Sequence, residues 1–210
     1  MTPPEPKYVF GIDQAKVSGW AIAEVRGKAI ASGIAKNHAE RNAALSDSRF
    51  LQRGAFGAHY ADVLVVFEDH SDFRMAYGSN RKANGQHQKP IRTQASLLSL
   101  GAARGRWEEL LDMYQHPERL RLSVTPKDWR ARVLSSRQSV GTEELKERAK
   151  RWASAHVGRW IADDNEADAI CIAAWGALDG LGVLMAERVQ RRTKARIKRE
   201  LAKQKPLAFE

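Results

Sequence analysis

The stretch YVFGIDQAKVSGWAIAEVRGKAIASGI, residues 8–34, holds the first elements of the fold. Its opening segment, Tyr8–Asp13, is short and β-prone, and two more such segments follow at residues 19–25 and 28–34. Arg26 and Gly27 stand between the last two segments and suit a tight turn. The spacing therefore predicts a strand, a short loop and a β-hairpin, which together form three antiparallel strands.

A second apolar run, VLVVF at residues 63–67, is continuous and ends in Glu68. A run of this kind is typical of a strand that is buried on both faces. Asn37 is placed to cap a helix that is expected to reach about residue 60. Further helices are expected over residues 93–114, 127–134, 142–156 and 165–178, and a fifth strand over residues 120–124. The chain is thus predicted to form an α/β domain with a mixed five-stranded sheet flanked by helices.

Composition indicates a folded basic protein. The 210 residues include 35 Lys and Arg against 25 Asp and Glu, for a net charge of +10. Such a charge favours a polyanionic partner, and nucleic acid is the usual one. A scaffolding role, binding to a membrane surface, or plain solubility remain open on charge alone.

Cysteine usage and hydropathy restrict the setting. Cys171 is the single cysteine, so the chain can form neither an internal disulfide nor a cysteine-based zinc site. We find no apolar signal region at residues 1–7 and no run of about 18 apolar residues. These features predict a soluble protein of the cytoplasm, of a bacterial cell or of a phage-infected host, without a membrane partner.

Three regions differ in character along the chain. Residues 1–7 are polar and proline-rich and are expected to be flexible, and residues 8–182 are expected to form one domain. Within that domain, residues 69–92 lack an apolar period and are expected to form a long basic loop. Residues 183–210 are expected to form a basic helical tail. That tail is either a solvated helix or an arm for nucleic acid, and both interpretations remain open.

Three acidic residues stand at the ends of predicted core elements. Asp13 closes the first strand, Glu68 closes the central apolar strand, and Asp168 lies in the first turn of the late helix. Buried carboxylates repel one another unless a cation neutralises them, and their oxygens are the ligands that suit Mg²⁺ or Mn²⁺. Two such ions can activate a water and stabilise the leaving oxygen in phosphodiester hydrolysis. Taken singly, each acid also fits a turn, an exposed strand end or a helix dipole.

The order of these acids matches a known family. Residues 11–20 (GIDQAKVSGW) resemble the opening motif of the RuvC-like Holliday-junction resolvases, which belong to the ribonuclease H-like superfamily. Residues 65–68 (VVFE), 99–105 (SLGAARG), 124–130 (VTPKDWR) and 165–170 (NEADAI) resemble later motifs of that family in the same order. The resemblance implies a ribonuclease H-like fold, in which residues 8–182 form the nuclease domain. A phage-type member is one expectation.

The resemblance also implies a site. Asp13, Glu68 and Asp168 are expected to be catalytic and to ligate Mg²⁺ or Mn²⁺, two ions per site. The family's fourth ligand falls on Asn165, which brings an oxygen but no charge; Asp164 is the alternative. One helical turn keeps Asn165 and Asp168 on one face.

Several basic and aromatic positions are expected to contact DNA. Arg130 and Lys146 match positions where the family has basic residues near the scissile phosphate, although a solvated surface role is equally open for both. Phe73 is a candidate for stacking on bases, with plain packing as the alternative. The remaining candidates are Arg74, Arg81, Lys82 and Arg104.

The function expected from the resemblance is resolution of four-way DNA junctions by two-metal hydrolysis. The family acts as homodimers, and the helix over residues 93–114 is the expected interface. Alternatives are a broader nuclease for flaps and forks, and a junction-binding protein without catalysis. An ATPase or sugar kinase of the related actin-like fold also opens with a strand-end Asp, but residues 15–18 lack the glycine-rich phosphate loop which those proteins need.

Overall fold

The computed structural model describes residues 6–25, 29–46, 63–69, 94–135 and 141–186, together with residues 190, 193, 194 and 197. These residues form a five-stranded sheet with the order β3-β2-β1-β4-β5. The strands are β1 (Tyr8–Asp13), β2 (Ser18–Glu24), β3 (Ala29–Ala35), β4 (Val63–Glu68) and β5 (Arg121–Val124). Strands β1, β2 and β3 pair antiparallel, whereas β4 runs parallel to both β1 and β5. The predicted mixed five-stranded sheet is confirmed.

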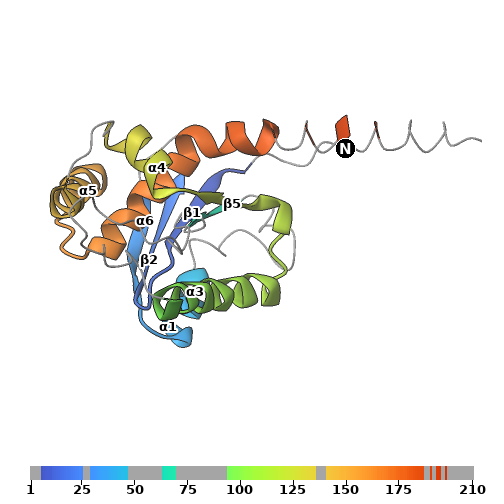
Figure 1. Ribbon diagram of the computed structural model, residues 1–210, viewed down its shortest axis with the longest axis horizontal. Coiled ribbons are helices and arrows are strands. Elements are labelled where there is room, and N and C mark those ends of the chain that lie inside the picture. Colours follow the sequence, from blue (N-terminus) through green and yellow to red (C-terminus); the bar gives the residue numbers. More distant parts are fainter. Residues whose placement is uncertain are drawn as a thin grey trace, which may run out of the picture.

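Helices cover both faces of this sheet (Figure 1). One face carries α4 (Pro126–Val133), α5 (Thr142–Val157) and α6 (Asp164–Trp175), and the other carries α1 (His38–Ser46) and α3 (Gln94–Met113). The short 3₁₀ turn η2 (Glu118–Leu120) leads from α3 into β5. The layers are therefore helix, sheet and helix, with a hydrophobic core on each side.

Strand alternation assigns side chains to these two cores. On β1, Val9 faces the α6 side, while Phe10 and Ile12 face α1 and α3. On β4, Leu64 and Val66 face α6 and their neighbours face the other way. Since successive side chains point to opposite faces, Asp13 and Glu68 belong to the α6 side of the sheet. The alternation of side chains along β1 and β4 therefore places both acids on the face of the sheet that α6 covers.

Glycines let α6 lie directly on the sheet. A methyl group at Gly11 would lie 2.5 Å from the backbone nitrogen of Ala173 and 2.6 Å from the carbonyl oxygen of Ala169. A methyl group at Gly19 would overlap the carbonyl group of Asn165. Gly19 is the register partner of Asp13 across the β1–β2 pair. The N-terminal turns of α6 therefore pass over the end of β1, in contact with its backbone.

The helix that begins with α6 is longer than the 165–178 segment expected from the sequence. It continues through the π-helical turn η3 (Gly176–Gly180) and stays helical to Ala186. The whole helix Asp164–Ala186 is apolar and long enough to cross a membrane, but 56% of its most apolar window is buried inside the protein. Packing against β1, β2 and β3 accounts for that apolar surface, as expected of a core helix.

Other element boundaries differ from expectation by one or two residues. Asn37 does cap α1, because its Oδ1 accepts a hydrogen bond from the Glu40 backbone N–H at 2.9 Å. Thr125 caps α4 by accepting from the Asp128 N–H, and Pro126 occupies the first turn. The expected extension of α1 to residue 60, nearly all of the 69–92 loop and most of the 183–210 tail lie outside the described residues.

Candidate active site

Asp13 and Glu68 stand side by side at one edge of the sheet. Strands β1 and β4 run parallel, with Ile12 in register with Phe67, so the next residue on each strand is one of the two acids. Paired strands lie about 4.8 Å apart. Asp13 is 7% exposed and Glu68 is 4% exposed. Two neighbouring carboxylates are thus almost fully shielded from solvent.

Asp168 lies near Asp13 and Glu68 and comes from helix α6, which covers that face of the sheet. Asp163 caps α6 by accepting hydrogen bonds from the backbone N–H groups of Asn165 and Glu166, at 2.9 and 3.0 Å. This cap fixes the first turn of the helix. Gly19 lets that turn lie against β2, and Gly11 lets the later turns lie against β1. Asp168 lies in the next turn, with 18% of its side chain exposed. The three acids that the sequence singled out are therefore neighbours in the fold.

Burial and the neighbouring negative charges raise the pKa values of Asp13 and Asp168. Burial, followed by the charges of Glu68 and Asp168, holds the pKa of Asp13 well above its ordinary value. Burial and the charge of Glu68 raise the pKa of Asp168 to about 7, although Arg130 counteracts part of the rise. Asp13 and Asp168 are therefore harder to ionise than ordinary carboxyl groups, as expected where carboxylates gather without a neutralising cation.

This crowding predicts a falling stability with rising pH when divalent cations are removed. The folded state holds a proton on Asp168 up to about pH 7, whereas the unfolded chain releases it near the ordinary value of 3.8. Between these values the folded state binds more protons, so the free energy of unfolding decreases as the pH rises, by at most about 1.4 kcal/mol per pH unit for one proton. Urea denaturation in EDTA from pH 5 to pH 8 measures this slope. Asp168→Asn should flatten the slope, and an unchanged slope in this variant would contradict the assignment.

Two of the three acids, Glu68 and Asp168, have a fixed side-chain neighbour. The indole Nε1–H of Trp129 donates to Oε1 of Glu68 at 3.0 Å, and the side-chain amide of Gln14 donates to the Glu68 carbonyl oxygen at 2.7 Å. Arg130 places its Nη2 3.6 Å from Oδ2 of Asp168, with its guanidinium over the Trp129 ring. One guanidinium therefore offsets only part of the charge of the cluster.

The donor set fits a divalent cation, although the carboxylates are not yet gathered around one point. Among the described residues, no three His, Cys, Asp or Glu side chains lie close enough together to hold a metal ion as they stand. Glu68 is directed towards Trp129 and Asp168 towards Arg130, as expected when like charges repel. Beside Asp13, the buried Oε1 of Gln14 accepts no hydrogen bond from any described residue. Excess buried negative charge and hard oxygen donors are what Mg²⁺ or Mn²⁺ binds.

The two candidates for the fourth ligand differ in their surroundings. Asp164 lies 3.2 Å from Nζ of Lys146 and 3.1 Å from Nζ of Lys150. Burial acts to raise the pKa of Asp164, but together Lys150 and Lys146 lower it below its ordinary value. Asn165 is half-buried and lies one turn before Asp168. Asp164 is thus bound by two ammonium groups, while Asn165 shares a helix face with Asp168.

The predicted DNA-contacting residues fall in different places. Arg130 adjoins the acids, and Lys146 adjoins Asp164. Arg104 lies over the ring of Phe67, on the opposite face of the sheet from Glu68, and bonds Glu108 at 2.8 Å and Ser123 at 3.2 Å. The other four, Phe73, Arg74, Arg81 and Lys82, lie outside the described residues.

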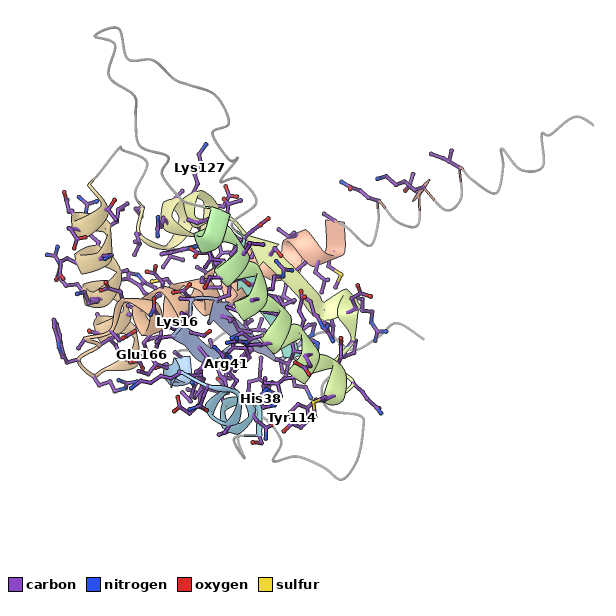
Figure 2. All side chains as sticks on the ribbon, turned by 60° about the horizontal axis from the view of Figure 1, so that its bottom comes forward. Lys16, His38, Arg41, Tyr114, Lys127 and Glu166 are labelled. Carbon is purple, nitrogen blue, oxygen red and sulfur yellow. The ribbon has the colours of Figure 1, made fainter. Side chains whose placement is uncertain are left out.

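Sequence reasoning missed Trp129, Gln14 and Arg41. The signal for Trp129 was available, since a buried indole N–H needs an acceptor and the residue follows the strand–proline segment closely. Arg41 is fully buried in α1, and its Nη2 donates to the Lys16 carbonyl oxygen at 3.3 Å (Figure 2). It thereby ties α1 to the turn that follows Asp13. Nothing in the helical pattern of α1 distinguished this arginine from a solvated one.

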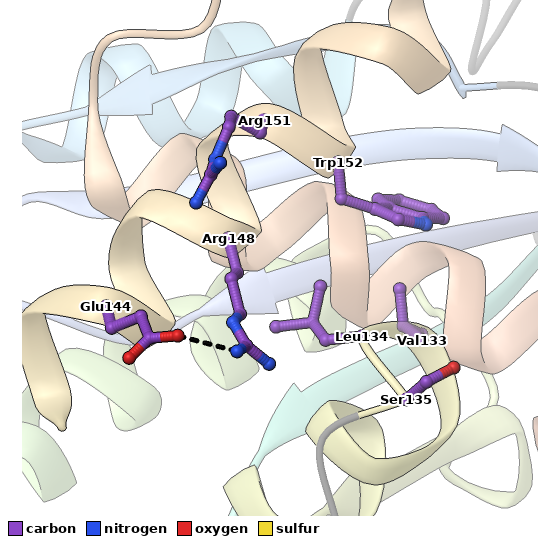
Figure 3. A pocket seen from close by; sticks show the side chains of 7 residues that line it. All are labelled: Val133, Leu134, Ser135, Glu144, Arg148, Arg151 and Trp152. Carbon is purple, nitrogen blue, oxygen red and sulfur yellow. Dashed lines mark hydrogen bonds and ion pairs between the residues drawn. The ribbon is translucent and has the colours of Figure 1, made fainter. Parts of the chain in front are cut away.

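An open cavity of about 640 Å³ lies between the end of α4 and one flank of α5 (Figure 3). Its lining is mixed, and Arg148 there pairs with Glu144 at 2.6 Å. The lining residues are Val133, Leu134, Ser135, Glu144, Arg148, Arg151 and Trp152. None of the three acids lines it. The candidate site is therefore defined by its buried charge, and this cavity is a separate feature.

The strand order and the helices on both faces of the sheet define an α/β fold, in which the three acids lie where β1 and β4 end and α6 begins. The fold is similar to that of RuvC from Thermus thermophilus, in a structure of RuvC in complex with Holliday junction substrate and in another RuvC structure. Both are 16% identical to this chain with a TM-score of 0.52, and both alignments cover 82% of this chain. They cover 94% and 95% of the RuvC chains. No protein-family model matches the sequence. No curated protein matches it either. The similarity therefore establishes a RuvC-like fold.

Proposed function

We propose that this protein is a divalent-metal-dependent DNA endonuclease that cuts branched DNA, with four-way junctions as its main substrate. The observation that carries the proposal is the meeting of Asp13, Glu68 and Asp168 in a buried, under-neutralised cluster. A fold needs a functional reason to bury three neighbouring carboxylates, because burial and neighbouring negative charge make Asp13 and Asp168 costly to ionise. Cation binding supplies that reason.

The chain's own residues divide the work. Asp13, Glu68 and Asp168 bind two Mg²⁺ or Mn²⁺ ions, and the amide oxygen of Asn165 is the proposed fourth ligand, since Asp164 is paired with two lysines. When bound, such ions supply activation of water and charge stabilisation at the cleaved phosphodiester. The expected products carry 5′-phosphate and 3′-hydroxyl ends.

Basic groups around the acids hold the DNA backbone. Arg130 is half-buried beside Asp168, and we propose that it turns to a phosphate once a cation neutralises the acid. Lys146 borders the same helix end through Asp164. A net charge of +10 adds a general attraction, as do the predicted loop residues Arg74, Arg81 and Lys82. Affinity for DNA should accordingly fall steeply with salt.

A four-way junction has two-fold symmetry, so a homodimer with two active sites suits it. One of the similar structures is of RuvC with a Holliday junction substrate, which supports this choice. We propose α3 as the dimer interface, because Leu98 and Met113 on this helix are 67% and 68% exposed. Light scattering of the purified protein measures the expected dimer.

An enzyme of this kind acts in the cytoplasm of a bacterium or of a phage-infected host.

Cleavage of synthetic substrates tests the proposal. Wild type and Glu68→Gln are incubated with a labelled four-way junction, a fork, a flap and a linear duplex, with Mg²⁺ or with EDTA. The expected result is Mg²⁺-dependent cutting by wild type, fastest on the four-way junction, and none by Glu68→Gln. Equal rates on forks and flaps would favour the broader nuclease. Binding to the junction without cutting by wild type in any divalent metal would favour a non-catalytic junction-binding protein.

A further inference from the structure

Trp129 makes a contact that no part of the function so far uses. Its side chain is fully buried in the core beneath α4, and its Nε1–H donates to Oε1 of Glu68 at 3.0 Å. The two residues are 61 positions apart in the chain. The hydrogen bond therefore depends on the tertiary fold.

Local structure brings the two residues together. Glu68 pairs with Val124 at the end of the β4–β5 ladder, and the Asp69 N–H bonds the Val124 carbonyl at 2.7 Å. Thr125 then caps α4 immediately, so that the first turn of the helix turns back over the strand end. Trp129 lies on the inward face of that turn. A helix that began later would carry the indole away from Glu68.

The chemistry of the indole suits a metal-binding carboxylate. An indole N–H is a donor only, and it carries no charge. It satisfies one oxygen of Glu68 without adding the positive charge with which Lys or Arg would oppose a cation. The carboxylate rotamer is thereby held before any ligand arrives. Hydrogen bonds of this kind to the ligands of metals commonly affect affinity by about 10–100-fold.

We propose that Trp129 is a positioning residue, which holds the Glu68 carboxylate in the orientation that a divalent cation needs. This inference rests on the metal site of the proposed function. Trp129 itself touches neither the cation nor the DNA in this account. It acts through its hydrogen bond to Glu68, and its ring also lies under the Arg130 guanidinium, a contact that a phenylalanine ring can keep. A purely structural role would require only the ring and would be indifferent to the N–H.

Trp107 provides a matched control within the same chain. It is also fully buried, in the core on the opposite side of the sheet, where its ring packs edge-on against Phe10. Its Nε1 bonds no acceptor among the described residues. Trp107→Phe therefore removes a buried indole without removing a hydrogen bond. Trp129→Phe removes a buried indole together with its hydrogen bond to Glu68.

The test is calorimetric titration of Mn²⁺ into wild type, Trp129→Phe and Trp107→Phe at pH 8, without DNA. Thermal unfolding of each variant checks that it is folded. We expect the Mn²⁺ affinity of Trp129→Phe to fall by about tenfold or more, and that of Trp107→Phe to stay within about twofold of wild type. Equal losses in both variants, or none in Trp129→Phe, would overturn the positioning role while the metal site stands. Failure of wild type to bind Mn²⁺ would overturn the metal site and, with it, this inference.

A second measurement keeps the proposal testable if Trp129→Phe does not fold. Wild type labelled with ¹⁵N at its six tryptophans gives six indole N–H signals in an NMR spectrum, and each signal can be assigned to one tryptophan. Glu68→Gln replaces the charged acceptor with an amide of similar size, so the Trp129 signal should move while the Trp107 signal stays in place. A Trp129 signal that is indifferent to Glu68→Gln would contradict the bond on which the proposal depends.

Discussion

Asp13→Asn should reduce the rate of Mg²⁺-dependent DNA cleavage by about a thousandfold or more. The side chain keeps its size but loses a charge at the centre of the cluster, next to Glu68 and under Asp168. The stabilisation that bound cations give to phosphodiester cleavage amounts to several kcal/mol, and each 1.4 kcal/mol corresponds to a tenfold change in rate. Single-turnover cleavage of a four-way junction at pH 8 measures this loss.

The same variant should be at least as stable as wild type when no divalent cation is present. Asp13→Asn removes a buried negative charge that burial and two other acids disfavour. Loss of activity together with unchanged or increased stability distinguishes a functional acid from a structural one. Asp112→Asn serves as the control, because Asp112 is exposed on α3 and pairs only with Arg121 among the described residues. Wild-type cleavage by Asp13→Asn would refute the role assigned to this acid.

Gly19→Ala should lower the free energy of unfolding by about 1–3 kcal/mol or more and abolish cleavage. The added methyl group would overlap the Asn165 carbonyl in the first turn of α6. Backbone cannot rotate away as a flexible side chain can, so α6 has to move from the sheet and take Asp168 with it. Urea denaturation and junction cleavage measure the two losses.

Gly101→Ala is the matched control for this substitution. Gly101 is an exposed residue of α3, and a methyl group there meets nothing within 4 Å. Because Ala is a better helix former than Gly, this variant should be as stable as wild type or more stable by up to about 1 kcal/mol. If Gly19→Ala behaved like Gly101→Ala, α6 would not be in close contact with β2.

Local sequence patterns were sufficient for much of the fold. The continuous run before Glu68 indicated a central strand, and the Arg26-Gly27 pair in the sequence indicated a break between two strands, β2 and β3, which do pair antiparallel. Asp13 and Glu68 could be identified as strand-end acids for the same reason. Their adjacency could not be derived from the residues, because it depends on the parallel register between β1 and β4, which joins segments more than 50 residues apart.

Contacts across the fold account for what the sequence left undecided. The lysines around Asp164 come from α5, so the residue spacing within α6 could not predict them. Arg104 stays a predicted DNA contact, and its place over the Phe67 ring could not be derived, because the charge of a helix residue does not reveal which face of the sheet that residue covers. The hydrogen bond from Trp129 to Glu68 likewise required the position of α4.

Mn²⁺ binding to the protein without DNA measures whether Asp13, Glu68 and Asp168 form a divalent-metal site. The titration is run at pH 8, above the raised pKa of about 7 of Asp168, so that this acid is ionised. We expect wild type to bind Mn²⁺ with release of heat or protons, and Asp13→Asn to bind Mn²⁺ about tenfold more weakly or worse. Mn²⁺ binding of equal strength to wild type and Asp13→Asn, or no binding to wild type, would show that these acids do not form such a site.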